Sequence, residues 1–182
     1  MIHYKSGDVL ASGCNFICHQ VNCRGKMASG IAGQIRNKWP VVYNKYHEMY
    51  SQAFAWSQNM DPVNGEATPA DYLLGDIQVV YVQNNDKGEF QYIINMFSQD
   101  AYGYDGETRY TSYDAFADCL YRIRNFVPKG QTIAFPWGIG CGLGNAHWNI
   151  IEKMIETILE DHEVYIYAQW MKHINKENKE NE

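Results

Sequence analysis

The chain has 182 residues, of which 46% are apolar and 20% are charged, as in an ordinary soluble domain. This composition excludes disorder over most of the chain, and no apolar run approaches the ~20 residues that a membrane-spanning helix needs. The formal net charge of −6 argues against a basic face for nucleic acid. We therefore expect neither a membrane partner nor sequence-specific nucleic-acid binding.

The first residues lack the apolar core of a secretory signal, and the five cysteines are an odd number. Cys14, Cys18 and Cys23 lie close together in the sequence, whereas Cys119 and Cys141 stand alone. This pattern indicates free thiols in a reducing compartment rather than a disulfide framework. We therefore expect a cytoplasmic protein.

In chain order, the first predicted element is a strand over residues 16–19, which is short and apolar and is followed by polar residues. Apolar residues at helical spacing predict a helix over residues 31–39. Pro40 should end that helix, and it also suits the first turn of a second helix that continues over residues 41–50. Residues 57–70 are rich in proline and asparagine with little periodicity, which predicts a loop.

The two clearest strands are predicted over residues 77–82 and 90–97. Residues 84–88 between them have the composition of a hairpin turn. A helix is predicted over residues 111–126 from a regularly spaced apolar stripe. The stripe consists of Phe116, Leu120, Ile123 and Phe126.

The last predicted elements are a strand over residues 132–136, a helix over 147–159 and a strand over 164–167. Strands and helices alternate, with one hairpin in the middle. This order predicts an α/β fold, a three-layer α/β/α sandwich with a mixed central β-sheet. One domain should span residues 1–170, and residues 171–182 form a polar tail that we expect to be disordered.

Two glycine-rich loops, residues 22–30 and 138–144, each lie between a predicted strand and a predicted helix. Ligands collect at the carboxyl ends of strands in open α/β sheets, and backbone N–H groups of glycine-rich loops can closely approach phosphate oxygens. Two such loops could hold a diphosphate between them. The alternative is that both are plain tight turns, since neither has the Walker spacing or the Gly-x-Gly-x-x-Gly fingerprint.

Six short segments follow one another in an order that resembles a known family. They are Tyr4-Lys5-Ser6-Gly7-Asp8-Val9-Leu10, Ile17-Cys18-His19-Gln20-Val21-Asn22-Cys23, Gly25-x-Met27-x-Ser29-Gly30-Ile31-Ala32, Asn95-Met96-Phe97-Ser98-Gln99, Tyr102-Gly103 and Ile139-Gly140-Cys141-Gly142-Leu143. Together they resemble a macrodomain, the ADP-ribose-binding module, and most closely the branch that processes ADP-ribose 1''-phosphate. The resemblance covers residues 2–167, and it implies a single macrodomain-like fold with ADP-ribose or a derivative as its ligand.

The resemblance also implies roles for matching residues. Asp8, beside Val9, would accept a hydrogen bond from the adenine amino group, and Asn22 would fix the distal ribose. The two phosphate loops would consist of Ser29, Gly30, Ile31 and Ala32, and of Gly138, Ile139, Gly140, Cys141, Gly142, Leu143 and Gly144. Trp170, just past the last strand, could stack on the adenine. The alternatives are a turn aspartate at Asp8 and a core aromatic at Trp170.

His19 falls where the phosphate-processing branch carries histidine and where many binding-type macrodomains carry asparagine. A pKa of about 6.5 would let its imidazole act as acid or base at neutral pH, and it could also attack a phosphoryl group. We therefore predict a catalytic His19, with Asp100 or Asp105 orienting the imidazole or a water. The alternatives are a histidine that only hydrogen-bonds the backbone and loop carboxylates that are merely solvated.

The favoured function is hydrolysis of an ADP-ribose derivative at the distal ribose, either as an ADP-ribose 1''-phosphate phosphatase or as an ADP-ribosyl hydrolase. One alternative is a non-catalytic reader of ADP-ribose or of ADP-ribosylated macromolecules, and another is an interaction protein without a nucleotide ligand. A related branch uses a lysine and an aspartate. Gly144 stands where that aspartate would fall, and no lysine lies near residues 95–99.

The cysteines raise two further possibilities. Cys18 and His19 are successive residues of a strand and point to opposite faces, so we expect no metal site there. A Cys-His hydrolase could pair Cys23 or Cys141 with His147, but no residue in the sequence orients such a pair. We expect no cofactor.

Overall fold

The computed structural model describes residues 2–59, 66–85 and 87–169, and these residues contain six strands in one sheet. The strands are β1 (Ile2–Ser6), β2 (Phe16–Asn22), β3 (Ile77–Asn84), β4 (Phe90–Gln99), β5 (Thr132–Pro136) and β6 (Glu163–Ala168). Their order in the sheet is β1-β6-β5-β2-β4-β3. Neighbours are parallel except for β3, which pairs antiparallel with β4 at one edge. The predicted mixed sheet is confirmed.

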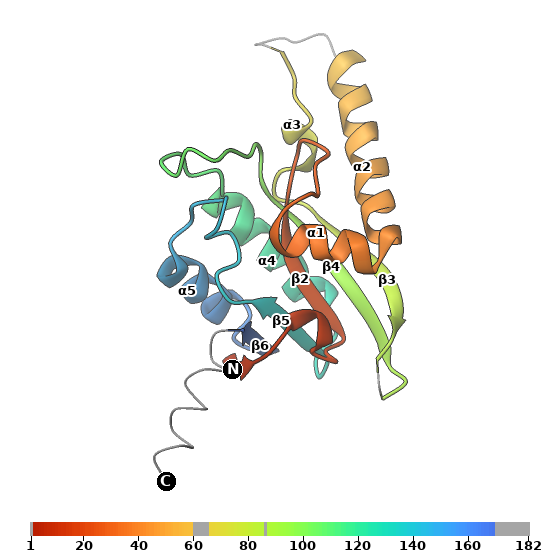
Figure 1. Cartoon of the computed structure of the whole chain (residues 1–182), viewed down its shortest axis with the longest axis vertical. Helices are drawn as coiled ribbons and strands as arrows, with labels where there is room; N and C mark the ends of the chain where they lie inside the picture. The colour runs from red at the N-terminus through yellow and green to blue at the C-terminus, as the bar shows by residue number, and fades with distance from the viewer. Residues whose placement is uncertain (1, 60–65, 86, 170–182) are drawn as a thin grey trace.

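Helices cover both faces of this sheet (Figure 1). They are α1 (Gly30–Lys38), α2 (Pro40–Asn59), α3 (Ala70–Leu73), α4 (Tyr113–Phe126) and α5 (Trp148–Ile158), with a short 3-10 turn, η1 (Val9–Ala11), after β1. Helices α4 and α5 pack on one face, and α1 and α2 pack on the other. The three-layer α/β/α sandwich is therefore confirmed. No helix among the described residues has the length and apolarity needed to cross a membrane.

Alternation along the strands builds a core on each side of the sheet. In β2, Cys18 packs with Phe116 and Leu120 of α4, whereas Ile17 packs on the opposite face with Ile35 of α1. These side chains are fully buried. Complete burial of one large apolar side chain contributes roughly 1.5–3 kcal/mol, so the two clusters fix the helices against the sheet.

Several predicted boundaries were wrong. Helix α2 continues to Asn59, so the loop predicted from residue 57 begins later, and α3 begins at Ala70 inside its predicted end. The buried Ala53 and Ser57 explain why the helix extends. Phe126, predicted as part of the buried stripe of α4, is 52% exposed and packs edge-on against Phe16. Residues 170–182, including Trp170 and the predicted tail, lie outside the described residues.

The sheet opens between β2 and β5. These parallel strands pair only at Phe16 with Ile133 and at Ile17 with Ala134. Beyond these pairs β2 pairs with β4 alone, and the end of β5 pairs with β6. The carboxyl ends of β2 and β5 therefore diverge, which is the arrangement that creates a ligand crevice in an open α/β sheet.

Candidate functional site

A cavity of about 680 Å³ lies where β2 and β5 diverge. Its walls come from the carboxyl ends of β2, β4 and β5 and from the loops that follow these strands. It is lined by Gln20, Val21, Asn22, Lys26, Ala28, Ser29, Gly30, Ile31, Ala32, Gln99, Tyr102, Tyr104, Pro136, Trp137, Gly138, Ile139, Gly140, Gly142, Leu143 and Gly144. Both glycine-rich loops predicted from the sequence therefore face one cavity.

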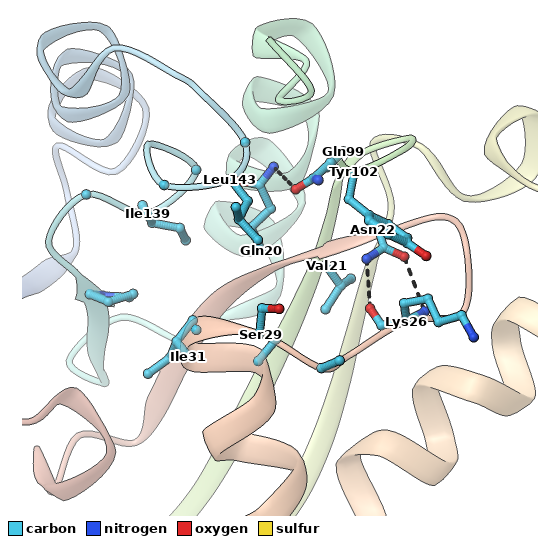
Figure 2. A pocket seen from close by; sticks show the side chains of 18 of the residues that line it. Gln20, Val21, Asn22, Lys26, Ser29, Ile31, Gln99, Tyr102, Ile139 and Leu143 are labelled. Atoms are coloured by element: carbon cyan, nitrogen blue, oxygen red, sulfur yellow. Dashed lines mark hydrogen bonds between the residues drawn. The ribbon is translucent and has the colours of Figure 1, made fainter. Parts of the chain in front are cut away.

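The two ends of the cavity differ in character. Ile31 and Ile139 lie toward one end, whereas Asn22, Lys26 and Tyr102 lie toward the other (Figure 2). The first end is apolar, and the second end carries amide, ammonium and phenol groups. A ligand with a flat apolar group at one end and hydroxyl groups at the other would match this polarity.

The first loop leads into the N-terminus of α1. Ser29 is the N-cap residue, and its side chain makes no capping hydrogen bond. Gly33 N–H donates to Ser29 O at 3.1 Å, but Ile31 and Ala32 N–H find no acceptor within the described residues. The first turn also contains no acidic residue. These N–H groups and the positive end of the helix dipole therefore favour an anion.

The second loop, residues 138–144, exposes further N–H groups. Gly138 and Gly140 adopt left-handed conformations with φ of 72° and 76°, and Cys141 N–H donates to Gly138 O at 2.8 Å. No acceptor among the described residues meets the N–H groups of Gly142 and Leu143. The loop can therefore donate to an anion from the side opposite α1. Cys141 belongs to this loop but does not line the cavity.

Asn22 lines the polar end and organises the first loop. Its Nδ2 donates to Lys26 O at 2.7 Å, and its Oδ1 accepts from Arg24 N and Lys26 N at 3.0 and 3.3 Å. Tyr46 of α2, whose side chain is fully buried, donates from its hydroxyl to Asn22, with its Oη 2.9 Å from Oδ1. Burial raises the pKa of Tyr46 well above its usual range, so this hydroxyl stays a donor.

Removal of that hydroxyl should loosen the first loop. We expect Tyr46→Phe to lower the free energy of unfolding by about 1 kcal/mol, because the hydrogen bond from the buried Tyr46 side chain to Asn22 is lost. Tyr43→Phe is the matched control, since Tyr43 lies one helical turn away and no hydrogen bond from its hydroxyl joins it to the described residues. Urea unfolding of both variants measures the difference. Equal stability of the two would contradict this role for Tyr46.

His19 does not line the cavity. It is fully buried on the opposite face of β2 from Gln20, and its Nε2 lies 2.5 Å from Asn95 Oδ1 on β4. Asn95 Nδ2 in turn donates to Gln78 Oε1 at 2.9 Å, and Gln78 Nε2 donates to Lys45 O on α2. Burial lowers the pKa of His19 to about 4. The imidazole is therefore a neutral link between the sheet and α2.

The two predicted carboxylate partners of His19 lie outside the cavity lining. Asp100 Oδ2 accepts from Arg24 Nη2 at 3.1 Å in a half-exposed ion pair, and its Oδ1 is buried without a partner among the described residues. Asp105 accepts from Thr108 and Glu107 N–H and from the Tyr110 hydroxyl, and these hydrogen bonds lower its pKa to about 2. Asp105 thus stabilises its own loop, whereas Asp100 joins its loop to the first glycine-rich loop.

The predicted adenine residues also lie outside the lining. Asp8 is the N-cap of η1, and its Oδ1 accepts from Leu10 N at 2.9 Å. Val9 is buried in the core on the α1 side. Trp170 lies outside the described residues. Of the predicted binding residues, those that line the cavity are Asn22, Ser29, Gly30, Ile31, Ala32, Gly138, Ile139, Gly140, Gly142, Leu143 and Gly144.

Sequence reasoning assigned no role to several lining residues, above all Gln20, Gln99 and Trp137. Gln20 is the second polar residue at the end of β2 and faces away from His19. Strand alternation could have identified it, because a polar side chain at the carboxyl end of a central strand points toward the crevice on one face. No comparable local signal marks Trp137.

The cysteines remain thiols. Burial raises the pKa of Cys23 to about 12 and also raises the pKa of Cys141, which disfavours the thiolate that a Cys-His hydrolase needs. His147 is the N-cap residue of α5. Over the described ranges, no three His, Cys, Asp or Glu side chains come together as a metal site would require.

No family model matches the chain. It is 28% identical over 172 residues to an uncharacterised 17.5 kDa protein from the tk-vs intergenic region of Enterobacteria phage T4, covering 91% of this chain and 95% of that protein. The macrodomain of Mycobacterium tuberculosis DarG superposes with a TM-score of 0.66 at 22% identity, over 92% of this chain and 97% of that chain. Thermosipho africanus DarTG, solved in complex with ADP-ribose, gives a TM-score of 0.67 at 17% identity, over 91% of this chain and 41% of that chain. The fold implied by the ordered motifs is thereby confirmed: this chain has the macrodomain fold.

Proposed function

We propose that the cavity binds ADP-ribose or a derivative of it, with the diphosphate between the N-terminus of α1 and residues 138–144. The observation that carries this proposal is the pair of opposed donor sets. The N–H groups of Ile31, Ala32, Gly142 and Leu143 border one cavity and meet no acceptor in the part of the chain that the structure describes. Backbone donors of this kind suit phosphate oxygens. The ADP-ribose in the Thermosipho africanus structure, which has the same fold, is consistent with this ligand.

The size and polarity of the cavity support the same ligand. Its volume of about 680 Å³ lies within the range of roughly 300–1,000 Å³ that is usual for small-molecule sites. The adenine would lie at the apolar end near Ile31 and Ile139, and the distal ribose at the end with Asn22 and Lys26 (Figure 2). A macromolecule attached to the distal ribose would then lie beyond the polar end.

The geometry supports binding without turnover better than hydrolysis. Each predicted catalytic side chain is engaged elsewhere: His19 with Asn95, Asp100 with Arg24, and Asp105 with its own loop. The ionisable side chains in the described lining are Lys26, Tyr102 and Tyr104. We therefore assign the chain as a reader of ADP-ribose or of ADP-ribosylated macromolecules, in place of the hydrolase favoured from the sequence.

Calorimetric titration with ADP-ribose, ADP and AMP tests the binding. We expect saturable 1:1 binding of ADP-ribose, at least about tenfold tighter than AMP, because only the diphosphate reaches both donor sets. No heat up to millimolar ADP-ribose would overturn the proposal. Incubation with ADP-ribose 1''-phosphate and with an ADP-ribosylated peptide tests the reader assignment, and product release at a rate proportional to protein concentration would replace it with a hydrolase.

A further inference from the structure

A polar cluster joins the two walls of the cavity. Gln20 Nε2 donates to Thr111 Oγ1 at 2.9 Å and also lies 3.2 Å from Gln99 Oε1. Thr111 Oγ1 in turn donates to Gly140 O at 3.0 Å. Figure 2 shows Gln20 and Gln99 joined at the cavity, between the two glycine-rich loops. Thr111 itself is 1% exposed and does not line the cavity, so any effect it has on a ligand acts through its neighbours.

The loop after β5 is shaped around Thr111. A Cβ atom at Gly144 would lie 2.3 Å from Thr111 Oγ1 and 2.5 Å from Gly140 O. One at Gly140 would lie 2.6 Å from Gln20 Oε1. By contrast, a Cβ at Gly142 meets nothing within 4 Å. The glycines at 140 and 144 therefore make room for Thr111 and Gln20, while Gly142, which also lines the cavity, has space for a side chain.

Thr111 also lies at the end of the segment that carries Tyr102 and Tyr104, two tyrosines that line the cavity. This segment leaves the sheet at Gln99 and returns at Thr111, and the two residues form an isolated bridge. Tyr110 N–H and Thr111 N–H both donate to Gly144 O, at 3.0 and 2.9 Å. These hydrogen bonds thus join the end of the segment with Tyr102 and Tyr104 to the end of the loop 138–144.

A second hydrogen bond joins the same two segments farther from the sheet. Asn145 Nδ2 donates to Gly106 O at 3.0 Å. Asn145 also has a positive φ of 55°, an uncommon backbone conformation for a residue other than glycine. This contact is exposed, whereas the Thr111 hydroxyl is buried and its contacts are part-buried. The Thr111 contacts therefore carry more of the coupling, because their shared hydroxyl is shielded from water.

We propose that Thr111 is a positioning residue that sets the spacing between residues 138–144 and the segment with Tyr102 and Tyr104, and so couples the two walls of the cavity. The consequence for ligand affinity rests on the proposed function, whereas the consequence for loop order does not. Loss of the Thr111 hydroxyl frees Gly140 O and Gln20 from their shared partner. Both walls then open more often, and a ligand must order them on binding.

Thr111→Val removes the hydroxyl and keeps the shape, and Thr111→Ser keeps the hydroxyl. Ser112→Ala is the matched control: Ser112 Oγ caps α4 by accepting from Ala115 N–H, so its loss destabilises the adjacent helix without touching the cluster. Amide hydrogen exchange of the unliganded full chain is measured over residues 100–110 and 138–146, and the Kd for ADP-ribose is measured by calorimetry.

We expect Thr111→Val to raise exchange at least about fivefold in both segments together and to weaken ADP-ribose binding about tenfold, as for the loss of one buried hydrogen bond. Thr111→Ser should restore both, and Ser112→Ala should change neither. Unchanged exchange in Thr111→Val, or an increase in one segment alone, overturns the coupling. Failure of the wild-type chain to bind ADP-ribose refutes the proposed function instead, because the exchange measurement needs no ligand.

Discussion

Gly142→Glu is expected to weaken the binding of ADP-ribose at least about a hundredfold. Gly142 lines the cavity in the loop that offers backbone N–H groups, and a Cβ atom there meets no other atom within 4 Å. The glutamate therefore fits without disturbing the fold, but it brings a negative charge beside the proposed diphosphate. Two like charges about 5 Å apart repel by roughly 3 kcal/mol at an effective dielectric constant of about 20, which corresponds to about a hundredfold in Kd.

Gly142→Gln is the control that distinguishes the effect of charge on binding from the effect of side-chain size. Glutamine matches glutamate in size and is neutral, so we expect it to weaken binding by less than about tenfold. Both Kd values are measured by calorimetry, and thermal unfolding of both variants checks that the fold is intact. Equal losses for the two variants would show that the loop excludes any side chain. Full binding by Gly142→Glu would show that the ligand does not reach this loop.

Stability should fall by about 3 kcal/mol between pH 6.5 and pH 4 because of His19 alone. Burial lowers its pKa from 6.5 to about 4 in the folded chain. Between these two values the unfolded chain binds a proton that the folded chain excludes, so unfolding becomes easier as the pH falls. Above pH 6.5 both states are neutral at this site, and below pH 4 both are protonated. A shift of about 2.5 pH units corresponds to about 3 kcal/mol.

His19→Gln removes this titration and keeps an amide that can reach Asn95. At pH 7.5 we expect the variant to be less stable than the wild type by about 1–2 kcal/mol, because a buried hydrogen bond is perturbed. This difference should shrink and then reverse on the way to pH 4, since only the wild type must exclude a proton. Urea unfolding at four pH values measures it.

The matched control is His47→Gln, which replaces an exposed histidine of α2 and should keep the pH profile of the wild type. A constant difference between His19→Gln and the wild type at every pH would argue that His19 is accessible to protons in the folded chain. That result would again make His19 a candidate for proton exchange with a ligand.

Much of the architecture was predictable because the local signals were strong. Val79 and Val80, and Ile93 and Ile94, lie in runs that only a sheet buries well, and Asn84 and Gly88 flank the hairpin turn between them. Helix ends were predicted less well. Helix α2 runs through Ser57 because Ala53 and Ser57 are buried, and that support comes from packing rather than from local preference.

The position of the glycine loops was also predictable, since glycines after a strand and before a helix mark the ligand edge of an α/β sheet. Which glycines leave no room for a side chain was not predictable. Gly140 and Gly144 lie tightly against Gln20 and Thr111, and Thr111 is 29 residues away from Gly140 in the sequence. A contact across that distance leaves no mark in the local pattern of either segment.

The sequence by itself determined the alternation of strands and helices, the two loops at one edge, and an ordered set of motifs that matches the macrodomain fold. Only the tertiary structure decided which side chains of β2 reach the cavity. Gln20, Val21 and Asn22 line it, whereas His19, which shares the face of Val21, is fully buried. That depends on where β5 leaves β2, after Ile17 and Ala134. The separation of the two strands opens the crevice beside Gln20 and leaves His19 buried under α2, because strand pairing is a long-range interaction that no local pattern encodes.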